Sequence, residues 1–134
     1  MGLNGTLCWS TVTSAIIQPD YFGRKVHVFV TNQLGTPLKL ICRSKDTTFG
    51  DHWLNHQQFF SWKFQTNLWG TTLFWCSMTW KNPQGYFITG SVDVFNFSRD
   101  GGGRCMGDCR WFVRQEGVYQ INNFNDKVVF MYKW

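Results

Sequence analysis

Two histidines four residues apart are the residues whose spacing most suggests chemistry. His52 and His56 have the spacing of the zinc ligands on a metalloprotease helix. That motif places a glutamate after the first histidine as general base, and Trp53 stands there instead. The surrounding residues predict a loop, in which two rings are poorly placed to act as general acid and base on one phosphate. The Gly-x-Ser-x-Gly nucleophile motif is also absent. We therefore expect no enzyme, no metal site and no cofactor.

Cysteines form the second group with chemical potential. They are Cys8, Cys42, Cys76, Cys105 and Cys109. Structural zinc sites use two closely spaced ligand pairs, and only Cys105 and Cys109 are close, so disulfides in an oxidising compartment are favoured over metal. Four cysteines allow three pairings, and Cys8 adds further options. Of these we favour Cys42 with Cys109 and Cys76 with Cys105, because two core strands would then each hold one end of a glycine-rich loop.

Two short motifs match the acceptor for N-glycosylation, at Asn4 and at Asn96, and they matter only in a secreted chain. The first twenty residues lack the basic start and apolar core of a signal peptide. We therefore expect a mature secreted protein whose signal peptide has been removed, with Met1 added for expression. Apolar runs are far shorter than the ~20 residues needed to cross a bilayer, so no membrane insertion is expected.

The formal net charge is +5, from 13 Lys and Arg against 8 Asp and Glu, with no long basic run. Such an excess speeds encounters with anionic surroundings but specifies neither a fold nor a reaction. Basic residues are mixed with aromatic ones at 62–64 and 110–114, where the aromatic residues alternate as core residues do. A nucleic-acid partner is therefore not expected.

The chain of 134 residues, 19% aromatic, has the size of one domain spanning 1–134. Residues of alternating polarity, rich in Val, Thr, Phe and Trp and bounded by turn residues, predict one short strand after another. The expected strands cover 26–31, 38–43, 60–65, 71–80, 86–97, 109–114, 117–121 and 127–133. We expect an all-β, antiparallel sandwich of seven to eight strands, filled by aromatic side chains and held by two disulfides.

Four segments of the chain resemble the plant self-incompatibility protein family, the S-protein homologues. Residues 26–34 are similar to the family's opening strand and Asn-x-Leu turn, and residues 42–46 to its Cys-x-Ser-Lys-Asp segment. The aromatic strand pair at 62–80 and the Cys-x-x-x-Cys-x-Trp segment at 105–111 resemble two further family motifs. The resemblance covers about residues 24–121. It implies a small secreted plant protein, a β-sandwich with two disulfides from the four shared cysteines, and no known enzymatic activity.

The resemblance also implies a role as an extracellular signalling ligand in cell–cell signalling, through binding to a cell-surface receptor. We expect recognition by the inter-strand loops, because loops vary freely on a fixed scaffold and carry recognition. The candidate loop runs from Lys45 to His56 and contains Lys45, Asp46, Asp51, His52, Trp53 and His56, with 82–85 as a second candidate. The alternative is a cell-wall-associated carbohydrate-binding protein, drawn to acidic polysaccharide and stacking Trp53 or Trp69 on sugar rings. A monomer is expected in either case.

Overall fold

The computed structural model describes residues 23–105 and 107–134. Nine strands follow one another: β1 (Lys25–Asn32), β2 (Leu38–Arg43), β3 (Thr48–Leu54), β4 (Phe59–Gln65), β5 (Leu73–Lys81), β6 (Phe87–Asn96), β7 (Gly107–Arg114), β8 (Gly117–Asn122) and β9 (Lys127–Lys133). One short helix, α1 (Phe97–Asp100), separates β6 from β7. The expected glycosylation site Asn4 and the cysteine Cys8 lie outside the described residues.

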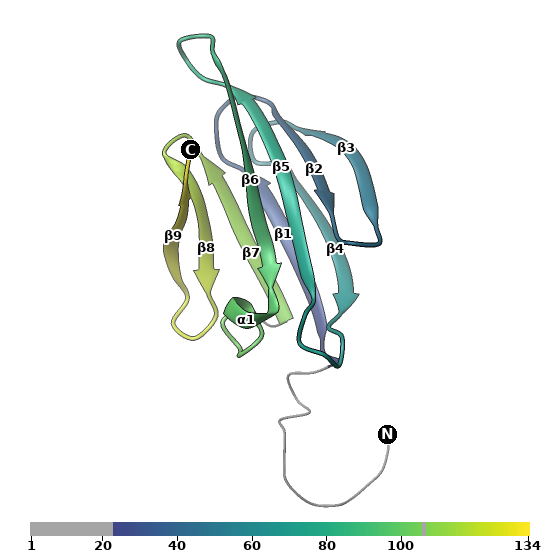
Figure 1. Cartoon of the computed structure of the whole chain (residues 1–134). Helices are drawn as coiled ribbons and strands as arrows, with labels where there is room; N and C mark the ends of the chain where they lie inside the picture. The colour runs from purple at the N-terminus through teal and green to yellow at the C-terminus, as the bar shows by residue number, and fades with distance from the viewer. Residues whose placement is uncertain (1–22, 106) are drawn as a thin grey trace, which may run out of the picture.

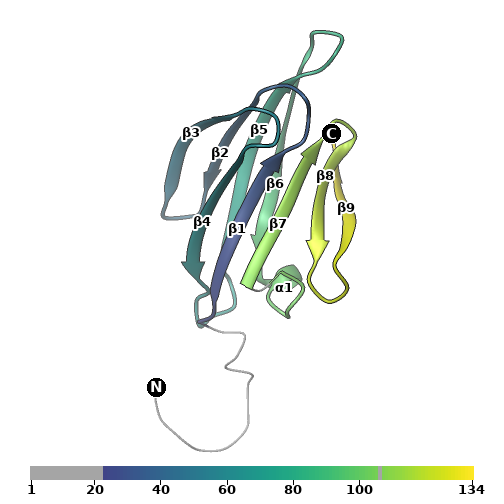
Figure 2. The same cartoon turned by 180° about the vertical axis from the view of Figure 1, so that it is seen from behind.

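The strands form two sheets that pack face to face (Figure 1). Sheet A has the order β4-β1-β7-β8-β9 and is seen from its outer side in Figure 2, and sheet B has the order β3-β2-β5-β6. Neighbouring strands in the described chain are antiparallel except β1 and β7, which pair in parallel from Val26 opposite Gly107 onward. The expected β-sandwich is confirmed, with one parallel pair at the centre of sheet A.

Strict alternation of side chains builds the core between the sheets. Val26, Val28 and Val30 of β1 are completely or almost completely buried, because successive side chains of a strand point to opposite faces. Trp111 of β7 is fully buried, and its indole N–H donates to the Val94 carbonyl of the opposite sheet at 2.8 Å. A buried tryptophan needs such an acceptor, and this bond ties the two sheets together at their centre.

Strand β3 and helix α1 differ from the expected loops. β3 occupies most of the predicted recognition loop and forms an edge of sheet B, where its residues are mostly exposed. One face of this edge strand contacts water and the other contacts little of the core. Its sequence therefore lacks the alternation of apolar and polar residues that predicts a strand. Helix α1 begins at an Asn96 cap whose side-chain oxygen accepts from the Ser98 N–H at 3.1 Å.

The predicted cysteine pairing is wrong, although the four cysteines do form two disulfides. Cys42 is bonded to Cys76, and Cys105 to Cys109. β2 and β5 are neighbours in sheet B and place Cys42 directly opposite Cys76, with their Cα atoms 4.0 Å apart. The Cys105–Cys109 bridge spans only four positions, at the end of the glycine-rich loop at 98–109, so neither bridge joins one sheet to the other.

Candidate functional site

A cleft of about 480 Å³ lies between the β2–β3 turn and the β4–β5 turn. Lys45 and Asp46 line one wall, at a turn closed by the Ser44 N–H donating to the Thr47 carbonyl at 2.8 Å. Both side chains are exposed, and within the described chain neither has a salt-bridge partner. The floor includes the aromatic ring of Phe74. A cation and an anion are therefore held side by side over an apolar floor.

Asn67 fixes the opposite wall of this cleft. Its side-chain oxygen accepts from the backbone N–H groups of Trp69 and Thr71, each at 3.1 Å, and its amide nitrogen donates to the Thr71 hydroxyl at 3.0 Å. The turn is thus ordered by its own side chain, as asparagine does in tight turns. It leaves Leu68 exposed and Trp69 85% exposed beside the cleft. The turn fixes the backbone of this tryptophan, and its exposed side chain is available to contact a partner.

Asp51 and Trp53 are separated from that cleft, because they lie on the outer face of β3. Trp53 is 63% exposed and stands opposite Lys39 of β2. The Lys39 ammonium lies 3.6 Å from the Asp51 carboxylate, an exposed ion pair. The predicted recognition loop is therefore divided by the strand. Lys45 and Asp46 serve the cleft, whereas Asp51 and Trp53 belong to the flat outer face of sheet B.

The two histidines are used to hold the backbone. One ring nitrogen of His52 lies 3.0 Å from the Phe49 carbonyl, and the ring stacks on Phe60 with 4.0 Å between centroids. His56 lies in the β3–β4 turn, where its Nδ1 accepts from the Gly35 N–H at 3.0 Å. No group of three or more His, Cys, Asp or Glu residues suited to a metal ion occurs in the part of the chain that the structure describes.

The second predicted loop, 82–85, is the tip of the β5–β6 hairpin, which projects beyond the other strands (Figure 1). The Asn82 side-chain oxygen accepts from the Tyr86 N–H at 2.9 Å and closes the turn. Tyr86 and Phe87 are both exposed at its base. The structure therefore places this loop far from Lys45 and Asp46, at the opposite end of sheet B.

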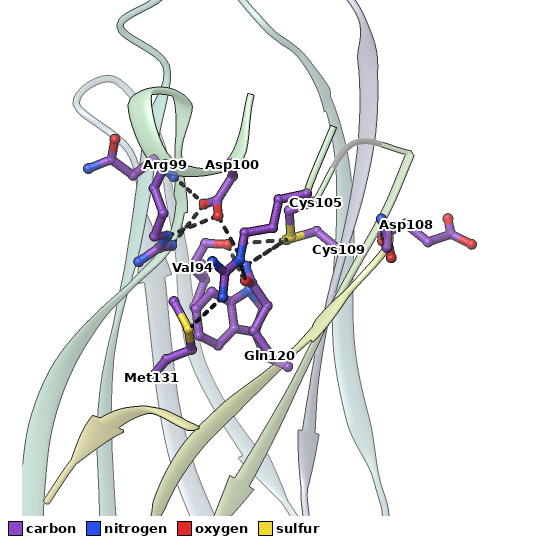
Figure 3. Close-up of a disulfide and its surroundings, with 12 residues drawn as sticks. Val94, Arg99, Asp100, Cys105, Asp108, Cys109, Gln120 and Met131 are labelled. Carbon is purple, nitrogen blue, oxygen red and sulfur yellow. Dashed lines mark hydrogen bonds and ion pairs between the residues drawn. A yellow bond between two sulfur atoms is a disulfide. The ribbon is translucent and has the colours of Figure 1, made fainter. Parts of the chain in front are cut away.

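A buried polar network below the glycine-rich loop was not predicted (Figure 3). The fully buried Asp100 accepts from Arg99 at 2.8 Å and from the Gln120 amide at 3.1 Å. The same amide nitrogen lies 3.1 Å from the Cys105 sulfur, so Gln120 joins α1 to the disulfide. Polar residues in β8 and α1 gave no pattern that could have revealed this contact. The network positions the loop and is not open to a ligand.

The network contains two cations, Arg104, which donates to the Gln120 side-chain oxygen at 2.9 Å, and Arg99. Arg99 lies over the Trp111 ring, 5.2 Å from its centroid. Burial opposes the charged form of the guanidinium, yet hydrogen bonding to Asp100, together with that carboxylate's charge, raises the pKa of Arg99 above its ordinary value. Arg99 therefore keeps its positive charge at neutral pH, as an ordinary arginine does. The charge is held in place and contributes nothing to a titrating site.

Fold and site together define a small disulfide-bonded β-sandwich whose exposed polar and aromatic groups lie at turns and on strand faces. The family model described as plant self-incompatibility protein S1 matches residues 27–134. S-protein homolog 29 of Arabidopsis thaliana is 38% identical over 112 residues, which cover 82% of this chain and 78% of that protein. S-protein homolog 5 of the same plant is 36% identical over 101 residues, covering 75% of this chain and 73% of that protein.

The chain belongs to the plant self-incompatibility protein S1 family, the S-protein homologues. A solved structure of a self-incompatibility protein homologue matches the fold with a TM-score of 0.59 and 20% sequence identity, over 84% of this chain and 96% of that one. That structure is described as representing small, highly stable, secreted proteins from plants. Membership places the chain among secreted proteins, in agreement with the location expected from its cysteines. No helix of the described residues is long and apolar enough to cross a membrane.

Proposed function

We propose that the protein is an extracellular signalling ligand that binds a cell-surface receptor through the cleft between the β2–β3 and β4–β5 turns. The observation that carries this proposal is the unpaired couple Lys45 and Asp46 facing the exposed Trp69 turn. Tryptophan contributes disproportionately to protein–protein binding energy, and charges at an interface rim set specificity and association rate. The family relationship supports an extracellular partner but names none.

The proposal is tested by the saturable binding of labelled protein to plant protoplasts, which have no cell wall to offer polysaccharide. Asp46→Ala and Trp69→Ala should each weaken binding about tenfold, in the range of interface hot spots, with little change in the melting temperature. Tyr86→Ala removes another exposed aromatic ring, 71% exposed against 85% for Trp69, at the far end of sheet B and is the matched control. If all three variants bind as tightly as the wild-type protein, the cleft is not the contact with the receptor. A large loss of stability in Asp46→Ala would make that residue structural.

A second candidate function is binding to a cell-wall polysaccharide. The specific observation in its favour is the exposure of large aromatic side chains on rigid elements, Trp53 on β3 and Trp69 on a closed turn. A net charge of +5 adds attraction to an acidic polymer. Attraction carried by net charge fades as salt shortens the ~10 Å Debye length, whereas a desolvated receptor contact persists. A salt titration on isolated walls and on protoplasts separates the two functions.

A further inference from the structure

The strand registers place a row of mostly aromatic residues across the outer face of sheet A, the face that is turned toward the viewer in Figure 2. The strand registers place Phe59 opposite Thr31, Thr31 opposite Phe112, Phe112 opposite Tyr119, and Tyr119 opposite Phe130. We call these five residues, four aromatic rings with Thr31 between Phe59 and Phe112, the aromatic belt. With strands about 4.8 Å apart, the belt is roughly 19 Å long and runs across all five strands.

The belt is open to solvent, most of all at its two ends. Phe59 is 57% exposed and Phe130 is 49% exposed. Phe29 packs against Phe59 with ring centroids 5.7 Å apart, and Tyr119 packs against Phe130 at 5.2 Å. Cross-strand aromatic pairs stabilise a sheet, and these pairs still leave about half of the Phe59 and Phe130 side chains exposed, with Thr31, Phe112 and Tyr119 partly buried between them. The row is suited to contact a flat, apolar surface.

Cations border the belt on both sides. The Arg114 guanidinium lies over the Tyr119 ring, 4.7 Å from its centroid, and Lys133 stands opposite Gly117 on the same side. Arg110 lies on the other side of the belt, next to Phe29 of β1. Flanking cations and a row of rings together favour an anionic ligand with apolar faces.

Arg110 is incompletely paired by the protein itself. Its Nε is buried and has no hydrogen-bond partner among the described residues. Its ion pair with Asp126 spans 4.0 Å, and the Asp126 side chain is 87% exposed, so water weakens the attraction. The side chain as a whole is 43% exposed, and a carboxylate matches the geometry of its outer guanidinium nitrogens. Arg110 therefore marks where an anionic group of the ligand is expected.

We propose that the aromatic belt binds a polyuronate, a polysaccharide chain whose sugar rings carry carboxylates. Its rings would lie along the belt, because the C–H faces of sugar rings are apolar and pack on aromatic side chains. Its carboxylates would meet Arg110 on one side and Arg114 and Lys133 on the other. The inference rests on the second candidate function and moves its site from Trp53 and Trp69 to sheet A.

Other occupants fit this face less well. A second copy of the chain would bring Arg110 and Arg114 against the same cations, and like charges repel. A protein partner usually anchors a side chain in a pocket at the centre of its interface. One hollow, of about 450 Å³, includes Phe59 in its lining and adjoins one end of the belt. Another, of about 570 Å³, is lined by Lys25, His27 and Lys63. Neither is lined by the central belt residues Phe112 and Tyr119.

The test is calorimetric titration of the intact oxidised protein with a long oligogalacturonate and with its methyl-esterified, neutral form. Arg110→Gln and Phe130→Ala should each weaken binding about tenfold, from the loss of one charge-assisted hydrogen bond or one stacked ring. Lys81→Gln removes the same charge from sheet B, and Phe87→Ala removes an exposed ring there. These controls should change the dissociation constant less than about twofold, as exposed surface changes do. Circular dichroism and melting temperature confirm that each variant is folded.

The outcomes separate the site from the function it rests on. No binding of oligogalacturonate by the wild type would overturn both the inference and the second candidate function. Binding that is lost in Trp53→Ala but retained in Arg110→Gln would overturn the belt alone. Equal losses of affinity in Arg110→Gln and Lys81→Gln would show that only the net charge matters. Equal affinity of the wild type for the oligogalacturonate and its neutral ester would show that the contact is not ionic. Either result would overturn the assignment of the ligand's carboxylates to Arg110. Absent oligogalacturonate binding combined with weaker protoplast binding by Arg110→Gln would assign the face to a protein partner.

Discussion

Removing the Cys42–Cys76 bridge should destabilise the fold about twice as much as removing the Cys105–Cys109 bridge. The first pair is separated by 34 residues and the second by 4. The chain-entropy model gives about 3.8 kcal/mol for a loop of the first length and about 1.9 kcal/mol for the second at 25 °C. All four cysteines are fully buried, so replacement by alanine leaves similar cavities in both cases. The expected difference of about 2 kcal/mol therefore reports loop closure.

The assay is guanidinium unfolding of the two double-alanine variants, followed by tryptophan fluorescence under oxidising conditions. Both variants and the reference protein carry Cys8→Ser, so that no spare thiol can exchange with the remaining bridge. The free energy of unfolding is compared at 25 °C, with the slope of the transition checked for each protein. An equal or larger cost for the Cys105–Cys109 variant would refute the reasoning. It would show that the contact of Gln120 with that bridge outweighs the entropy of the unfolded chain.

Three further outcomes follow from the fold. Asp100→Asn should lower the free energy of unfolding, measured in urea, by about 3 kcal/mol, because it leaves the largely buried Arg99 without its counter-charge. A loss below about 1 kcal/mol, the value of an ordinary surface ion pair, would contradict this. Gly117→Ala should cost about 2 kcal/mol, because its Cβ would lie 2.3 Å from a β9 carbonyl, whereas Gly102→Ala meets nothing within 4 Å and should be neutral. Secretion from plant cells should add an N-glycan at Asn96. Deglycosylation should then lower the mass of the peptide that contains Asn96, and an unchanged mass would show that the residue is unmodified.

The strands that bury one face were predictable from residue order alone. Val26, Val28 and Val30 alternate with outward residues, and the same period marks the strands around Leu38 and Cys76. Turn residues then placed the boundaries within a few positions. These signals are local, because each arises from neighbouring residues facing opposite sides of one strand.

The features that depend on long-range register were not predictable. Cys42 faces Cys76 only because β2 and β5 become neighbours, which no local pattern encodes. For the same reason Lys45 and Asp46 could be named from the sequence as candidate recognition residues, whereas the turn around Asn67, which forms the opposite wall of the cleft, could not. Phe112, a residue of the aromatic belt, was interpreted from the sequence as a core residue. When both faces of a strand carry aromatic residues, the alternation does not show which face is buried.

The parallel pairing of β1 with β7 has a consequence for how the chain must be synthesised and folded. β1 is an interior strand of sheet A with buried valines on its inner face, yet one of its two neighbours begins only at Gly107. All four strands of sheet B lie within residues 38–96 and can be present, with their disulfide, before β7 emerges. During that interval one edge of β1 is uncovered and able to pair with other chains. We therefore expect aggregation of this chain mainly in the interval before β7 covers β1.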